Sequence, residues 1–188
     1  MASRRSVRWP WVVVFLLCIA VAGVFFARPL AFRVVTWKTM RRFPAVQWIG
    51  ADSLSARLLS VSLHPPLVLD ARTAEEYAVS HLPTAQRIDP YRPDLRMIAT
   101  PPKDTAIIVY SSVGYRGARV ADWLVGQGYT RVTNLTAGIF AWANAERPLV
   151  RSGGPTVTVH PYGGRWGLLL LARHRADMPP LPRESAAP

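Results

Sequence analysis

The polar stretch at residues 111–116 is the part of this sequence best equipped for chemistry. It reads Ser-Ser-Val-Gly-Tyr-Arg, follows the apolar run 106–110 and precedes a helix-like stretch over 117–125. A strand, a short loop with glycine and a helix N-terminus present unpaired backbone N–H groups to an anion. Arg116 adds a permanent charge and a planar set of donors. The pattern predicts an anion-binding loop that consists of Ser111, Ser112, Val113, Gly114, Tyr115 and Arg116.

Ser111 occupies the mouth of this loop, where a reaction would need a nucleophile. A serine hydroxyl stays protonated at neutral pH unless a base lies beside it. The sequence contains no Gly-x-Ser-x-Gly elbow, and none of its four histidines is recognisable as a partner of Ser111. We therefore do not expect serine-hydrolase chemistry.

Short apolar strands alternate with helical segments through the middle of the chain. The predicted strands are 46–49, 67–69, a short one at Ile88, 106–110 and 132–135. The predicted helices are one through Leu54–Leu59 capped by Asp52 or Ser53, a turn or two at 75–77, and 95–99, 117–125 and 138–144. This alternation implies an α/β fold with a parallel sheet covered by helices on both faces. Ligands of such sheets bind beyond the carboxyl ends of the strands, and the loop at 111–116 lies at such an end.

Three segments, in order and suitably spaced, resemble the rhodanese (thiosulfate sulfurtransferase) family over residues 45–150. They are Asp70-Ala71-Arg72 through Glu76-Tyr77 to His81-Leu82-Pro83, then the loop, then 128–148 with its Gly138-Ile139-Phe140-Ala141-Trp142. Three positions where the family usually has glycine differ: Ser80, Thr84 and Ala137. The resemblance implies a three-layer fold around a central parallel sheet.

The resemblance also implies a loss of activity. The family has a cysteine that carries a persulfide at the position of Ser111, and a serine hydroxyl cannot form a persulfide. Four residues separate Ser111 from Arg116, which resembles the shorter sulfur-binding loop rather than the longer loop of related phosphatases and arsenate reductases. Gly117 stands where a serine or threonine commonly follows the arginine.

Asp70, Arg72, Glu76 and His81 are predicted to support the loop rather than to react. The first three suit an ion pair and turn contacts, and His81, next to Leu82 and Pro83, suits a hydrogen-bonded structural role. Two interpretations of Arg116 stay open at this point. It either binds an anion or forms a salt bridge with a nearby acid.

The N-terminal part of the sequence predicts a membrane anchor. Residues 1–8 form a basic tail, 9–27 are uncharged and long enough to cross a bilayer, and 28–44 form a basic juxtamembrane linker. A cleaved signal peptide is the alternative, because Ala20-Val21-Ala22 provides a small-x-small site. Basic residues flank the run on both sides, so both orientations of a single-pass protein in a bacterial plasma membrane are open.

The C-terminal part extends beyond the family resemblance. Residues 151–176 form an extension with a predicted edge strand at 156–160 and a leucine run at 168–171, and 177–188 form a Pro-rich tail predicted to be disordered.

Cys18 is the only cysteine, so neither an intrachain disulfide nor a cysteine-rich metal site is expected. No cofactor is predicted. The net charge is +12, but no nucleic-acid recognition motif accompanies it.

Together these features predict a membrane-anchored rhodanese-like domain that is inactive in sulfur transfer. Its expected role is to bind a protein partner, a small oxyanion or a sulfur-containing ligand, besides the lipid around 9–27. Two alternatives remain. One is a residual enzyme that uses the thiol or persulfide of a partner, and the other is a structural membrane protein whose loop stays empty.

Overall fold

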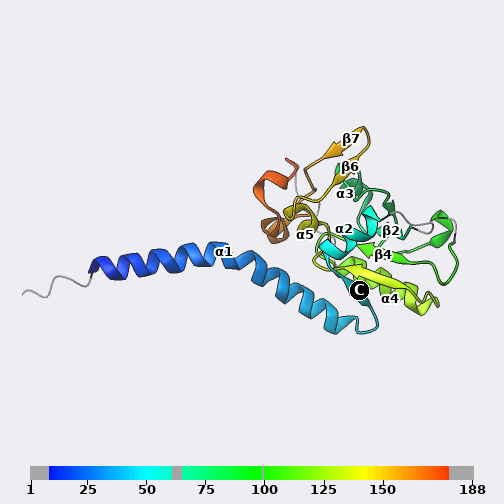
Figure 1. Cartoon of the computed structure of the whole chain (residues 1–188), viewed down its shortest axis with the longest axis horizontal. Helices are drawn as coiled ribbons and strands as arrows, with labels where there is room; N and C mark the ends of the chain where they lie inside the picture. The colour runs from blue at the N-terminus through cyan, green and yellow to red at the C-terminus, as the bar shows by residue number, and fades with distance from the viewer. Residues whose placement is uncertain (1–8, 61–64, 99, 178–188) are drawn as a thin grey trace, which may run out of the picture.

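Five short strands form one parallel sheet at the centre of the domain (Figure 1). The computed structural model describes residues 9–60, 65–98 and 100–177. The strand order is β1-β5-β4-β2-β3, with β1 Gln47–Ile49, β2 Leu67–Asp70, β3 Gln86–Arg87, β4 Ile107–Tyr110 and β5 Val132–Leu135. The predicted parallel sheet is therefore confirmed. The strand that leads into Ser111 is the central one, and Tyr110 at its end pairs in register with Asp70.

Helices connect these strands, and a small antiparallel hairpin follows them. The remaining elements are α1 Trp9–Arg42, α2 Ala51–Leu59, α3 Ala74–Val79, α4 Tyr115–Gly126, α5 Gly138–Asn144, β6 Leu149–Arg151, β7 Gly154–Thr156 and the 3₁₀ helices η1 Leu95–Ile98, η2 Gly164–Leu169 and η3 Ala172–His174.

Several local predictions were wrong. Gly50 rather than Asp52 or Ser53 is the N-cap of α2, without a side-chain cap; the Asp52 carboxylate instead accepts a hydrogen bond from Arg147. Residues 95–98 of the helix predicted at 95–99 form only a 3₁₀ turn, and residue 99 lies outside the described residues. The strand predicted at 156–160 ends at Thr156, because it belongs to the hairpin.

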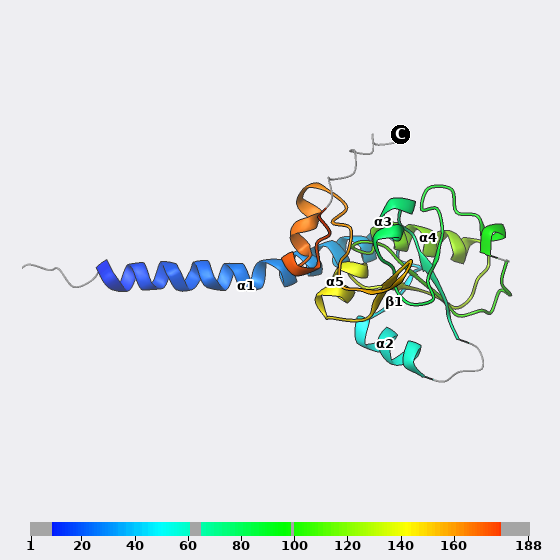
Figure 2. The same ribbon diagram turned by 90° about the horizontal axis from the view of Figure 1, so that it is seen from above.

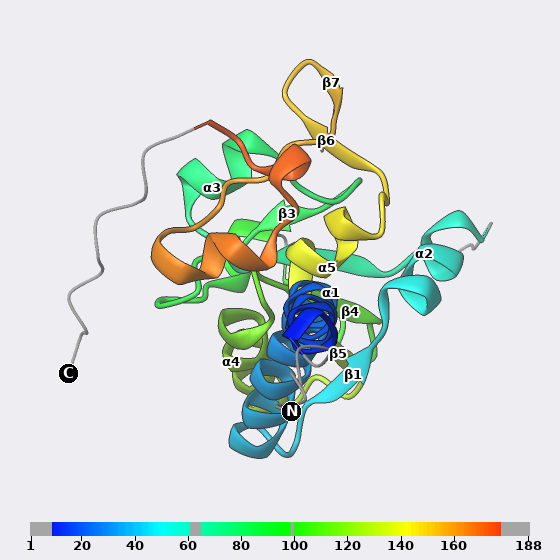
Figure 3. The same cartoon turned by 90° about the vertical axis from the view of Figure 1, so that its left-hand side faces the viewer.

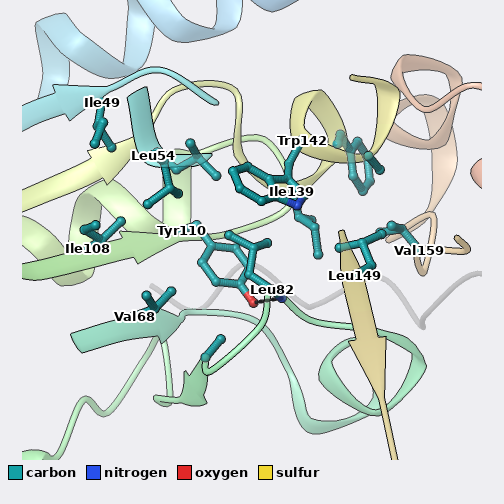
Figure 4. Packing of buried hydrophobic residues seen from close by; sticks show 14 of the residues in the cluster. Ile49, Leu54, Val68, Leu82, Ile108, Tyr110, Ile139, Trp142, Leu149 and Val159 are labelled. Carbon is teal, nitrogen blue, oxygen red and sulfur yellow. Dashed lines mark hydrogen bonds between the residues drawn. The ribbon is translucent and has the colours of Figure 1, made fainter. Parts of the chain in front are cut away.

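Two hydrophobic clusters cover the two faces of the sheet because strand residues alternate in direction. On one face Val68, Ile108 and Tyr110 pack with Ile139 and Trp142 of α5 (Figure 4). The other face holds Leu69, Ile107, Val109 and the inner side of α4 with Ala118, Ala121 and Leu124. The Tyr110 hydroxyl at the edge of the first cluster accepts a hydrogen bond from the Leu82 N–H at 3.1 Å. Both ends of the loop at 111–116 are thus anchored in core.

The segment 28–44, predicted to be a linker, is mostly helical. Helix α1 runs without a break through Pro29 and ends at Arg42. The N-terminal part of α1 extends away from the domain (Figures 1 and 2). Its C-terminal part contacts α4 and η2, and Phe32 packs against the first hydrophobic cluster. Phe43 is 6% exposed and meets Tyr115 edge to face at 5.5 Å. Apolar side chains of this segment therefore have a docking surface on the domain.

No helix within the described parts of the chain meets the length and hydropathy required of a membrane span. The predicted basic tail at 1–8 and residues 178–188 of the predicted Pro-rich tail lie outside the described residues.

The C-terminal extension packs on the domain. Val159, Leu169 and Leu170 belong to the first hydrophobic cluster, and the Asn144 side chain of α5 hydrogen-bonds the backbone of both Leu169 and Leu171 at 2.8 Å. Figure 3, which looks along α1, shows this segment in orange beside the helix. The extension is therefore part of the folded unit.

Two of the three glycine positions that differ from the family pattern keep a glycine-like backbone. Thr84 has φ of 63° and Ala137 has φ of 56°, in the left-handed region that costs a residue with a Cβ about 1 kcal/mol. Ser80 is different, because its φ of −171° is extended backbone. The two left-handed turns persist even though the residues that favour them have been replaced.

Candidate functional site

Helix α5 holds the loop at 111–116 from behind. The N–H of Ile139 donates to the carbonyl of Ser111 at 2.9 Å, and that of Phe140 donates to the carbonyl of Ser112 at 3.1 Å. A Cβ at Gly138 would collide with both carbonyl oxygens, so only glycine permits this approach. With these carbonyls tied to α5, the loop and the first turn of α4 can present N–H groups to the opposite side.

Ser111 is the first residue of the loop and is 1% exposed. Its Oγ accepts a hydrogen bond from the Gly114 N–H at 3.2 Å. Gly114 has φ of 98°, which turns the chain into α4. A thiolate sulfur at this position would face the same donor and the positive end of α4, so the geometry that favours an anion is present without a thiol.

Asn134 supports the loop from β5. Its Nδ2 donates to the carbonyl of Gly114 at 2.9 Å. A Cβ at Gly117 would clash with Asn134 Oδ1 and approach the Tyr110 carbonyl carbon to 2.9 Å. The glycine therefore makes room for the asparagine. The sequence contained both residues but no signal that they meet.

Glu76, Ser112 and Arg116 form a buried network on one side of the loop. Glu76 Oε1 accepts from Ser112 Oγ and from Arg116 Nη2, both at 2.7 Å, and Arg116 Nη2 also lies 2.9 Å from Ser112 Oγ. Thr73 completes a capping box with Glu76 at the start of α3. The Glu76 side chain is 0% exposed and that of Arg116 is 9% exposed. Arg116 thus does form the predicted salt bridge.

One nitrogen of Arg116 takes no part in the salt bridge. Its Nη1 is buried and has no hydrogen-bond partner among the described residues, and its guanidinium lies 4.6 Å from the centre of the Tyr162 ring. Burial alone would lower the pKa of Arg116, but Glu76 raises it. Burial alone would likewise raise the pKa of Glu76, but Arg116, assisted by Arg72 and Ser112, holds it below its ordinary value.

Asp70 and Arg72 lie deeper and contact the strand end instead of the loop. Two hydrogen bonds of 2.7 and 2.8 Å join their side chains, both 0% exposed. Arg72 also donates to the carbonyl of Ser80 at 2.5 Å, and the Tyr110 hydroxyl donates to Asp70 at 2.6 Å. Burial alone would lower the pKa of Arg72, but the Asp70 carboxylate raises it above its usual value. The pair positions β2 and β4, whose ends carry the site.

His81 does not join the loop. Its ring stacks on Tyr77 with centroids 4.1 Å apart, and Nδ1 donates to the carbonyl of Leu82 at 3.0 Å. Of the four predicted supporting residues, only Glu76 contacts the loop.

A pocket of about 460 Å³ opens over the loop. Besides residues of the loop it is lined by Val34, Val35, Lys38 and Thr39 of α1 and by Tyr162 and Trp166. These lining residues could not be found from the sequence, because neither α1 nor the extension carries a motif that places it over the loop.

His160 is a buried residue of the extension for which the sequence offered no functional signal. It is 1% exposed, and its Nδ1 accepts from the Tyr162 N–H at 2.9 Å, which makes Nε2 the protonated nitrogen of the neutral ring. Burial lowers the pKa of His160. The imidazole therefore holds Tyr162 in place as a neutral group.

Over the described residues, no cluster of three or more metal-ligating side chains occurs.

Comparison with known proteins matches residues 51–145 to the rhodanese-like domain. A protein of Allochromatium vinosum named sulfurtransferase is 36% identical over 109 residues, which cover 58% of this chain and 99% of that protein. The crystal structure of thiosulfate sulfurtransferase from Pseudomonas aeruginosa is 28% identical with a TM-score of 0.50, over 56% of this chain and 20% of that one. The BH2092 protein of Bacillus halodurans shares the fold at 23% identity and a TM-score of 0.52, over 67% of this chain and 88% of that one.

Proposed function

Because this chain belongs to the rhodanese-like domain family, we propose that it is a membrane-anchored member that binds an anion and does not transfer sulfur. One observation carries the proposal. A hydroxyl, Ser111 Oγ, stands in a loop that is otherwise organised for an anion, with the Gly114 nitrogen 3.2 Å away and Arg116 in the lining of the same pocket. A hydroxyl there can accept from the loop but cannot carry a sulfane sulfur.

The first test is the transfer of sulfur from thiosulfate to cyanide by the full chain in detergent micelles. We expect the wild-type protein to remain at background and Ser111→Cys to turn over at least about 100-fold faster, because the new thiol would lie at the N-terminus of α4, where the thiolate is favoured. Thiocyanate formation is the measurement.

Ser112→Cys is the matched control. It introduces the same thiol one residue later, on a side chain that contacts Glu76 and Arg116, and should stay at background. Turnover by the wild-type protein would contradict the absence of sulfur transfer. Absence of thiocyanate formation by Ser111→Cys would contradict the proposal that the anion-binding loop is intact.

The anchor is inferred from the sequence of residues 9–27 as a whole, which hold no charge and cover about 28 Å as a helix at about 1.5 Å per residue. The exposure of large apolar side chains at the start of α1 supports it: Trp9 is 78% exposed and Phe15 is 64% exposed. Such a surface requires an apolar partner, and a bilayer provides one.

Extraction of membranes with alkaline carbonate tests the anchor. The wild-type chain should stay in the membrane pellet. Leu16→Arg should release a larger fraction than Leu30→Arg, because an arginine near the middle of a span costs about 3 kcal/mol and Leu30 lies beyond Arg28, outside the run. Release of the wild-type chain, or equal release of the two variants, would refute a spanning anchor.

A further inference from the structure

The pocket over the loop has walls that the family domain does not supply. The family match covers residues 51–145, whereas Val35 and Lys38 come from α1 and Tyr162 and Trp166 come from the C-terminal extension. These two segments are held together by contacts between α1 and η2, including a hydrogen bond of 3.1 Å from Arg28 Nε to the Leu168 carbonyl. The pocket therefore depends on two segments that lie outside the family match.

The charges of the pocket suit one negative charge. The lining contains Lys38 and Arg116 and no acid. Glu76 behind the loop compensates one of these two charges through its salt bridge with Arg116, which leaves a net charge of about +1. Arg116 Nη1, buried and unpaired within the described part of the chain, is a donor that lacks an acceptor. A buried donor of this kind costs free energy until an acceptor arrives.

The rest of the lining is mostly apolar. Val34, Val35, Val113 and the rings of Tyr162 and Trp166 surround the space between α1 and the extension. A volume of about 460 Å³ far exceeds that of a small oxyanion and lies in the range of pockets that bury organic ligands. A small ion at Arg116 would leave these apolar walls in contact with water. A ligand with an apolar part would bury them and would therefore bind more favourably.

We propose that this pocket binds a monoanionic amphiphile, with its carboxylate, sulfonate or sulfate head at Arg116 and its apolar chain between α1 and Trp166. The proposal rests on the anion-binding function above and specifies its ligand class. Val34 lies six residues beyond Arg28, about 9 Å along the helix axis, so a membrane around residues 9–27 would be close to the pocket. The amphiphile can thus be a membrane lipid or a free molecule.

Calorimetric titration of the full chain in zwitterionic nanodiscs, with empty nanodiscs subtracted, tests the proposal. The probes are methanesulfonate, butanesulfonate and octanesulfonate. We expect affinity to rise roughly two- to fourfold per added methylene, as apolar burial predicts, and octanol to bind at least tenfold more weakly than octanesulfonate. Anionic-lipid nanodiscs separate the two sources, because an occupying lipid would block octanesulfonate and a free amphiphile would bind unchanged.

Three variants make the test specific to the pocket. Val35→Asp, which puts a carboxylate in the wall, should reduce octanesulfonate affinity at least tenfold, whereas Thr36→Asp, one residue away and outside the lining, should leave it within twofold. Lys38→Gln changes an exposed side chain, does not threaten folding and should weaken binding roughly threefold or more.

Two outcomes separate this inference from the proposed function. Equal affinity for all three sulfonates would overturn the amphiphile and leave anion binding at the loop intact. Failure of every sulfonate to bind, methanesulfonate included, would overturn both.

Discussion

We expect Asp70→Asn to lower the free energy of unfolding by about 4 kcal/mol, since removal of one partner from a buried ion pair leaves the other charge uncompensated. Both side chains of the Asp70–Arg72 pair are 0% exposed. The carboxylate accepts two hydrogen bonds from Arg72 and one from Tyr110, and an amide can offer only one acceptor oxygen to these three donors. Urea unfolding followed by circular dichroism measures the loss.

The control is a double-mutant cycle with Arg72→Met. Replacing the arginine in the Asp70→Asn background removes the uncompensated charge, so the double variant should be more stable than the sum of the two single losses by about 2 kcal/mol or more. Additive losses would mean that the pair contributes through packing alone.

The strands and helices around the site could be predicted because each is short, apolar and bounded by polar or glycine-containing turns. The predicted strand at 132–135 and the predicted helix at 138–144 coincide with β5 and α5. In both elements, the secondary structure that the local composition favours is the one that also buries the apolar side chains. The predicted cap at Asp52 or Ser53 was wrong because α2 begins at Ala51, with Gly50 as its N-cap, which places both residues inside the first turn.

The walls of the pocket could not be predicted, because they depend on docking between segments far apart in the chain. Residues 28–44 have the composition of a basic linker, yet Thr39 is 2% exposed and Phe43 is 6% exposed. Periodicity reports which face of a helix is apolar but not which surface covers it. Nothing in the sequence around Tyr162, apart from its aromatic side chain, indicates that it lines the pocket.

The two interpretations of Arg116 that the sequence left open proved to be compatible. A guanidinium has five N–H donors in a planar fork, so Nη2 can bind Glu76 and Ser112 while Nη1 stays without a partner among the described residues. From the sequence, a salt bridge and a contact with an anion were alternative roles for Arg116. The geometry of the guanidinium allows it to form both contacts at once.

We expect Glu76→Gln to lower the free energy of unfolding at pH 7 by about 3 kcal/mol, because it leaves Arg116 without its counter-charge in a buried site. Glu76 accepts from Ser112 through Oε1 and from the Thr73 N–H through Oε2. Glutamine has one acceptor oxygen, so the expected loss combines the missing charge with one missing acceptor. Glu75→Gln is the matched control on the same helix turn. Glu75 is exposed and should have a far smaller effect.

The pH dependence of stability distinguishes loss of this charge from a packing defect. The pKa of Glu76 in the folded protein lies below its ordinary value of 4.5, so the folded state binds its proton less readily than the unfolded state does. The stability that Glu76 contributes is therefore fully present above pH 4.5 and is lost as the pH falls below it. Glu76→Gln should reduce the slope of unfolding free energy against pH in that window by up to about 1.4 kcal/mol per pH unit. An unchanged slope, with the same loss at every pH, would show that the carboxylate acts through shape rather than charge.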